Sequence, residues 1–309
     1  MWFKNLLVYR IPAGWTANPA DIETRLARHP LQPCGGLERE THGWIAPGGD
    51  ERLLRVLNGQ LLIAFGTEQK LLPASVVNQT AGERADAIAA QQGYRVGGKQ
   101  LREIRERVAD ELLPRAFVRR FTTRIWIDPL NGWLVIDAAS PNKAQPLLEM
   151  LRETLDDLPV HLLRTQRSPG SAMTEWLVTG EAPAGFTIDR ELELKACDEE
   201  MATVRYVRHD LEGEEIRQHI AAGKVATRLA MTWNDRISFV LTEQAQVKRL
   251  AFLDILKEEA EAQADSAEEL FDIDFTLMSG ELAHLLADLS AALGGEVAED
   301  ATATTAPPF

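Results

Sequence analysis

The fold class of this chain follows from residues 53–65, Leu53-Leu54-Arg55-Val56-Leu57-Asn58-Gly59-Gln60-Leu61-Leu62-Ile63-Ala64-Phe65. Two apolar, β-prone runs flank Asn58-Gly59, a residue pair that favours a two-residue hairpin turn because both positions tolerate positive φ. Similar turns occur at two further places. They are Asn131-Gly132, between 125–127 and 134–136, and Asn234-Asp235, between 226–233 and 237–241. Three hairpins predict antiparallel sheet.

Helical patterns separate the hairpins, so the sequence predicts an α+β fold. We expect an elongated chain of several parts, built from antiparallel hairpins with packed helices. The expected helices span residues 18–28, 74–92, 99–113, 143–155, 173–178, 212–222, 252–264 and 279–293. The expected strands outside the hairpins are 3–10, 159–163 and 204–207.

Breaks in these patterns suggest domain boundaries. Residues 1–73 and 120–166 are expected to form a central α+β domain, interrupted by a helical tip domain at 74–119. The linker-like Arg167-Ser168-Pro169-Gly170-Ser171 opens a base α+β domain at 167–295. Residues 296–309 are small, acidic or proline, and we expect a disordered acidic tail there.

The net charge of −14 is unevenly distributed along the 309 residues. Residues 250–309 contain fourteen acidic residues and one basic residue, so the remainder of the chain is close to neutral. Charges farther apart than the Debye length, about 8 Å at physiological salt, hardly interact through solvent. An acidic total is therefore compatible with a local basic surface that binds phosphate.

No run of the chain approaches the length and apolarity of a membrane span, and the start of the chain does not resemble a signal peptide. We therefore expect no membrane partner and a cytoplasmic protein. The cysteines, Cys34 and Cys197, are far apart and are expected to remain reduced thiols.

Candidates for catalysis are weak. The six histidines are scattered and none has a metal-ligand spacing, so we expect no metal site and no cofactor. Asp128 and Asp137 could form a carboxylate pair, but the pattern favours turn and strand-end residues of the second hairpin. We expect a protein that is not an enzyme and has no catalytic residues.

The strongest functional signal is Pro114-Arg115-Ala116-Phe117-Val118-Arg119-Arg120-Phe121-Thr122-Thr123-Arg124. It contains four arginines and two phenylalanines and no acidic residue, and it lies where a helix gives way to a strand, which predicts an exposed turn. Arginine binds phosphate through bidentate hydrogen bonds, and an aromatic ring can stack on a base. The alternative is that Phe117 packs in the core and the arginines only solvate a turn.

Two weaker basic sets accompany this segment. Lys99 and Arg102 oppose the apolar stripe of the helix at 99–113, and Arg95 precedes it. A solvated helix with i,i+4 ion pairs explains that pattern as well. Arg208, His209 and Lys224 form the second set, mixed with acidic residues.

Several blocks, in order along the chain, resemble the bacterial recombination-associated family RdgC. They are residues 2–10, Leu112-Leu113-Pro114-Arg115-Ala116-Phe117, Trp126-Ile127-Asp128, Asn131-Gly132, Thr174-Glu175-Trp176, 222–227, Val247-Lys248-Arg249-Leu250, 274–278 and Gly280-Glu281-Leu282. No single block is a chemical motif. Their succession from residue 2 to about residue 295 is what carries the resemblance.

The resemblance implies a nucleoid-associated protein that binds double- and single-stranded DNA with little sequence preference and restrains RecA-dependent recombination. It also implies a ring-shaped homodimer with a basic interior, closed by two self-complementary interfaces. The tip region and the basic residues before Asp210-Leu211 would face DNA, and the acidic C-terminal region would face outward. The expected DNA-binding residues are Arg95, Lys99, Arg102, Arg115, Arg119, Arg120, Phe121, Arg208, His209 and Lys224.

Three alternatives remain open on the residues alone. The chain could be a non-catalytic protein-interaction scaffold without DNA binding, in which the arginines only solvate turns. It could be an enzyme that uses Cys34 or Asp137 in an unrecognised site. It could bind RNA, because phosphate contacts alone do not distinguish RNA from DNA.

Overall fold

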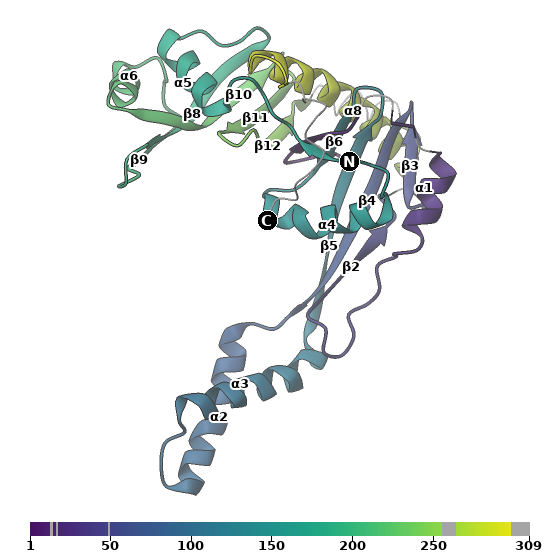
Figure 1. Ribbon diagram of the computed structural model, residues 1–309, viewed down its shortest axis with the longest axis vertical. Coiled ribbons are helices and arrows are strands. Elements are labelled where there is room, and N and C mark those ends of the chain that lie inside the picture. Colours follow the sequence, from purple (N-terminus) through teal and green to yellow (C-terminus); the bar gives the residue numbers. More distant parts are fainter. Residues whose placement is uncertain (13–14, 17, 49, 255–263, 298–309) are drawn as a thin grey trace.

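The computed structural model describes residues 1–12, 15–16, 18–48, 50–254 and 264–297. The described chain is a crescent: two β-sheets and their helices form the upper part, and a helical hairpin lies at the lower end (Figure 1). The α+β class with antiparallel sheets is confirmed. No helix in these ranges is both long enough and apolar enough to cross a membrane.

The first sheet has the strand order β2-β4-β5-β6-β1-β7, with β3 paired to β4. Its strands are β1 (Leu7–Arg10), β2 (Glu40–Ile45), β3 (Leu54–Leu57), β4 (Gln60–Leu71), β5 (Phe117–Asp128), β6 (Trp133–Ile136) and β7 (His161–Leu162). The predicted Asn58-Gly59 hairpin is confirmed. Asn58 and Gly59 have φ of 51° and 78°, and Leu57 faces Gln60 across the turn.

Strands β4 and β5 extend beyond β6 as a long ribbon, and β2 pairs along β4 as far as Gln69. Their pairing runs from Leu61 opposite Ile127 to Leu71 opposite Phe117. The expected exposed turn at 114–124 is therefore wrong, because most of that segment is strand. The sequence could not show this, since the pairing joins residues about fifty positions apart.

The ribbon carries the helical hairpin of α2 (Ala74–Gln92) and α3 (Gly98–Leu112), followed by the short η1 helix (Leu113–Arg115). The bounds of α2 are as predicted; Gly93 ends it in the left-handed conformation, with φ of 80°. The buried core of this hairpin is small. It consists of Ala81, Ala85, Ile104 and Val108.

The second sheet has the order β12-β11-β10-β8-β9. Its strands are β8 (Phe186–Ala196), β9 (Thr203–Val207), β10 (Lys224–Trp233), β11 (Ile237–Thr242) and β12 (Val247–Phe252). Strand β8 was not predicted. The helix expected at 252–264 is wrong at its start, because Phe252 ends β12; residues 255–263 lie outside the described ranges.

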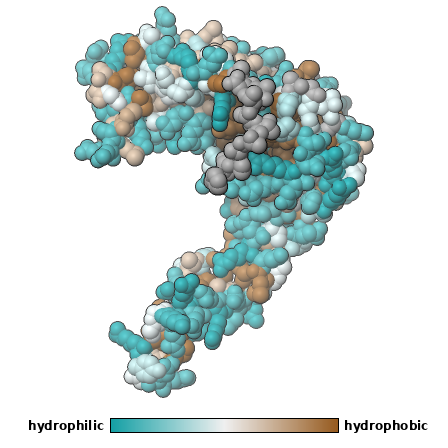
Figure 2. All heavy atoms as spheres, in the orientation of Figure 1, coloured by the Kyte–Doolittle hydropathy of each residue, from teal (hydrophilic) through white to brown (hydrophobic). Residues whose placement is uncertain are grey.

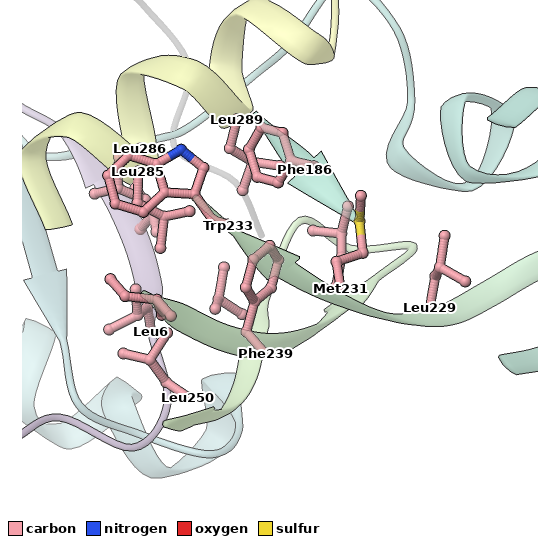
Figure 3. Close-up of a cluster of buried hydrophobic side chains, with 14 of the residues drawn as sticks. Leu6, Phe186, Leu229, Met231, Trp233, Phe239, Leu250, Leu285, Leu286 and Leu289 are labelled. Carbon is pink, nitrogen blue, oxygen red and sulfur yellow. The ribbon is translucent and has the colours of Figure 1, made fainter. Parts of the chain in front are cut away.

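Three helices cover one face of the second sheet: α5 (Pro169–Thr179), α6 (Glu214–Ala221) and α8 (Ala267–Ala292). Figure 3 shows Leu285, Leu286 and Leu289 of α8 beside Trp233 and Phe186. The same core includes Leu6, Leu62 and Trp126 of the first half of the chain. The predicted central and base domains thus share one hydrophobic core.

The other face of the first sheet is covered by α1 (Pro19–Leu26) and α4 (Pro141–Thr154). Asn18 caps α1 as predicted, since its side chain accepts a hydrogen bond from the backbone of Ala20. The start of the predicted tail is ordered. Val297 N–H donates to the carbonyl of Arg164 at 3.0 Å, and the Glu296 carboxylate lies 2.9 Å from Arg10. Residues 298–309 lie outside the described ranges.

Candidate nucleic-acid interface

The arginines of β5 do not form one cluster, because successive residues of a strand point to opposite faces. Phe117, Arg119 and Phe121 share one face of the ribbon, and Arg120 lies on the other. All four side chains are exposed to solvent. The alternative in which Phe117 packs in the core is wrong, since this side chain is 86% exposed.

Arg120 is held by a buried carboxylate across the ribbon. Its Nε donates to Glu68 Oε2 at 2.6 Å; the Arg120 side chain is 69% exposed and that of Glu68 only 4%. Glu68 also accepts from the backbone N–H of Cys34 at 2.8 Å. The Cys34 N–H and the Arg120 guanidinium hold the pKa of Glu68 below its usual value, so this carboxylate stays ionised. Arg120 therefore has a structural role and an exposed guanidinium edge.

The tip residues are exposed but lie in a region of mixed charge. Arg95 lies between α2 and α3, and Lys99 lies in the first turn of α3. Arg102 pairs with Glu106 at 3.1 Å, which fits the salt-bridged helix alternative. Arg115 ends η1 and is exposed.

The set at the end of β9 is distant from the ribbon. Arg208 is exposed with φ of 55°, whereas His209 bonds to Glu215 at 2.8 Å and stacks on Tyr206 at 5.2 Å between ring centroids. Lys224 is half-buried at the start of β10. Figure 1 places β9 and the helical hairpin at opposite ends of the crescent, so the predicted residues do not converge on one spot.

A further basic surface, the helix-free face of the second sheet, was not predicted from the sequence. In Figure 1, α5 and α6 lie on the outer side of this sheet, and the helix-free face is turned toward the hollow of the crescent. We call it the open sheet face. Its basic residues are Lys195, Arg205, Arg228, Lys248 and Arg249.

A small polar hollow lies on the open sheet face. It has a volume of about 150 Å³. Its charged lining residues are the basic Lys195, Arg228 and Lys248 and the acidic Glu193 and Glu243. These lysines and the arginine come from three different strands, β8, β10 and β12. Their grouping depends on strand pairing, and two of those strands were not predicted.

The cations of the open sheet face lie above carboxylates. Arg205 and Arg249 both bind Glu191, at 2.9 and 2.7 Å. Arg228 lies 3.7 Å from Glu193; its side chain is 47% exposed and that of Glu193 is 21% exposed. Hydrogen bonds from Arg249 and Arg205 outweigh burial and hold the pKa of Glu191 below its usual value. The arrangement, like that of Arg120 over Glu68, fixes the arginines while presenting positive charge outward.

The catalytic candidates have structural contacts. Asp128 is fully buried and accepts hydrogen bonds from the backbone of Leu130 and Asn131, both at 3.1 Å. Asp137 accepts from the backbone of Lys4 and Asn5 at 3.0 and 2.9 Å, and its burial raises its pKa. Cys34 and Cys197 are free thiols. Within the described ranges, no three His, Cys, Asp or Glu side chains are grouped so that they could hold a metal ion.

The family model and the curated relatives that match this chain name the same family. The family model that matches residues 1–296 is described as "Putative exonuclease, RdgC". The recombination-associated protein RdgC of Dechloromonas aromatica strain RCB is 55% identical over 302 residues, which cover 97% of this chain and 99% of the relative. That of Janthinobacterium sp. strain Marseille is 52% identical over 297 residues, covering 96% and 99%.

A third relative, the recombination-associated protein RdgC of Herminiimonas arsenicoxydans, is 51% identical over 299 residues, covering 97% of this chain and all of the relative. Over almost its whole length, the chain is therefore similar to a class of recombination-associated proteins. It belongs to the RdgC family.

Proposed function

We propose that this protein binds double- and single-stranded DNA without sequence preference. The observation that carries the proposal is a set of exposed arginines, each paired with a buried or partly buried carboxylate, on the ribbon and on the open sheet face. Such groups neutralise phosphates, which every DNA sequence presents in the same way. The paired arginines come from sheet strands, β5, β9, β10 and β12.

The crescent suggests how the basic surfaces act together. Two copies related by a two-fold axis would close into a ring if both ends of the crescent met their counterparts. The small core of the helical hairpin favours such a contact, since two helices bury little apolar surface by themselves. In this homodimer the open sheet faces would line the interior.

A role in recombination follows from occupancy of DNA. A protein that covers duplex or single strands competes with RecA for filament sites, and it would thereby restrain RecA-dependent strand exchange. We accordingly propose a nucleoid location for the protein. The family's recombination-associated name is compatible with this indirect role.

The test of this proposal is neutralisation of the two ribbon arginines, Arg119→Gln with Arg120→Gln. We expect the double variant to bind unrelated duplexes about tenfold more weakly, with a slope of log K against log salt that is shallower by about 2. Fluorescence anisotropy with two duplexes of different sequence measures both quantities. Because the two arginines face opposite sides, the single variants show which face contacts the duplex.

A control with the same charge change is Lys143→Gln with Arg217→Gln, on exposed positions of α4 and α6. It should leave binding within about twofold. A sequence-dependent loss in the Arg119 and Arg120 variant would contradict phosphate binding. Circular dichroism is needed alongside, because Arg120 also holds Glu68.

The family description favours one other function, an exonuclease. We propose binding without cleavage, since the candidate carboxylates Asp128 and Asp137 are engaged by backbone N–H groups. End-labelled duplex and single strand, incubated with the protein and Mg²⁺ or Mn²⁺, should remain full length. Progressive shortening of the label would support the exonuclease.

A further inference from the structure

We propose that Phe117, Arg119 and Phe121 form a stacking surface for unpaired bases, through which the protein holds single-stranded nucleic acid in a way that it does not hold duplex. This inference rests on the DNA-binding function proposed above and assigns the single-strand contact to a particular site. We call these three side chains the β5 stripe.

The β5 stripe follows from strand geometry. Its members are alternate residues of β5, so they lie on one face, about 7 Å apart from one to the next. Phe117 is 86% exposed and Phe121 36%. Exposed phenylalanine rings on a strand are costly to solvate, and they are typical of surfaces that meet a ligand. Figure 2 shows hydrophobic atoms at the junction of the arm with the helical hairpin, on an otherwise hydrophilic arm.

The planar guanidinium group of Arg119 provides a flat surface beside the Phe121 ring. The guanidinium carbon lies 4.4 Å from the centre of the Phe121 ring, a cation–π contact that orients the guanidinium. Guanidinium planes and aromatic rings are the two side-chain groups on which unpaired bases stack. The β5 stripe therefore offers two stacking places, the open Phe117 ring and the guanidinium of Arg119, which Phe121 positions.

Spacing favours unpaired over paired bases. The bases of a duplex are about 3.4 Å apart along each strand, and both faces of each base are covered by its neighbours. Side chains about 7 Å apart cannot stack on successive duplex bases without unstacking them. The cost is much smaller for a single strand, because its bases are unpaired and only weakly stacked.

The surroundings suit a nucleic acid backbone. The sequence contains no acidic residue from Leu112 to Ile127. Across the ribbon, the stripe faces Leu71, Gln69 and Thr67. Glu40 of β2, which lies opposite Gln69 of β4, accepts a hydrogen bond from Gln69 at 2.9 Å and pairs with His42 at 3.1 Å. Charge complementarity therefore favours a polyanion over an apolar protein surface.

The experiment replaces both rings with leucine, Phe117→Leu and Phe121→Leu, which keeps apolar volume and removes the aromatic faces. Anisotropy is measured with a labelled oligothymidine, a duplex, and an abasic single strand of equal length. We expect the double variant to bind oligothymidine about ten- to a hundredfold more weakly and the duplex within twofold. Wild type should bind the abasic strand about as weakly as the variant binds oligothymidine.

Each contrary outcome has a distinct meaning. Unchanged oligothymidine binding in the variant, or tight binding of the abasic strand by wild type, overturns the stacking surface alone. Equal loss on duplex and single strand, with a change of oligomeric state in sedimentation, overturns it in favour of a contact between two copies. No binding of any DNA by wild type overturns the proposed function itself. Leu130→Ser, at a position 83% exposed on the 128–133 turn, is the control for removing an exposed apolar side chain.

Discussion

Replacing Lys195, Arg228 and Lys248 with glutamine is expected to weaken duplex binding about a hundredfold at 0.1 M salt. The three side chains line one hollow of the open sheet face, although they come from three strands. If each holds one phosphate, the slope of log K against log salt should become shallower by about 3. Anisotropy titrations over a range of salt concentrations measure the loss and the slope together.

The open sheet face was not predicted from the sequence, so this variant tests the structure independently of the β5 arginines. A matched control removes three positive charges elsewhere, with Lys143→Gln, Arg152→Gln and Arg217→Gln on α4 and α6. The control has the same net charge as the variant. If both lose affinity equally, only overall charge matters and the open sheet face is not a DNA contact.

Replacing Arg55 with methionine is expected to reduce the free energy of unfolding by about 3 kcal/mol at neutral pH, near the low end for breaking a buried ion pair. Arg55 is 7% exposed and joins β3 to α8. Its guanidinium binds Asp272 at 2.6 and 2.8 Å, Glu268 at 3.1 Å and Asp50 at 2.9 Å. Methionine would leave Glu268 and Asp272 without this cation, whereas Asp50 would keep its ion pair with Arg52.

The loss should depend on pH. Burial raises the pKa of Asp50, but hydrogen bonds from Arg52 and the charges of first Arg52 and then Arg55 outweigh it and lower the pKa overall. A carboxylate with a lowered pKa stabilises the fold above its unfolded pKa, about 3.9 for Asp, and this stability is lost as the pH falls through the folded value. Wild type and variant should therefore converge in acid.

Urea denaturation at pH 7 and at about pH 2, well below the unfolded pKa of Asp, measures this convergence. Arg52→Met is the control, since Arg52 is 70% exposed and its ion pair should contribute under about 1 kcal/mol. An equal loss at both pH values would show that Arg55 acts through packing of its aliphatic stem. No loss at either would refute the role of this network in holding α8.

The Arg55 network also changes the interpretation of the acidic C-terminal region. The family resemblance implied an outward-facing acidic segment, but several of its acids bind other parts of the chain. Glu268 and Asp272 bind Arg55, Glu281 pairs with Arg236 at 2.9 Å, and Asp288 accepts from the Trp233 indole at 2.9 Å. Much of this acidity therefore fixes α8 on the two sheets.

Local signals predicted the hairpins and several helices well, because turn residues and caps act over a few positions. Asn58-Gly59 and the glycine after α2 are examples. One local signal was missed: Ser266 caps α8 by accepting from Glu269 N–H at 3.1 Å, so the helix begins at Ala267 and not near Ser279. A serine three residues before a glutamate is a recognisable start.

The candidate site was harder to predict, because strand pairing decides which side chains meet. The composition of 114–124 revealed the arginines, but only the pairing of β4 with β5 shows that Arg119 and Arg120 face opposite sides and that Glu68 holds Arg120. The open sheet face was missed with β8 and β12. In both strands, charged residues alternate with apolar residues or interrupt them. The apolar residues are buried by neighbouring strands and by α8.

The most direct test of DNA binding is the affinity for a labelled random duplex at two salt concentrations. If about six phosphates are contacted, the slope of log K against log salt is about −5, and affinity should fall about a thousandfold between 50 and 200 mM salt. The loss should be equal for unrelated sequences. Absence of binding at 50 mM would contradict the proposed function and favour a protein-interaction scaffold, in which the exposed arginines only solvate the surface.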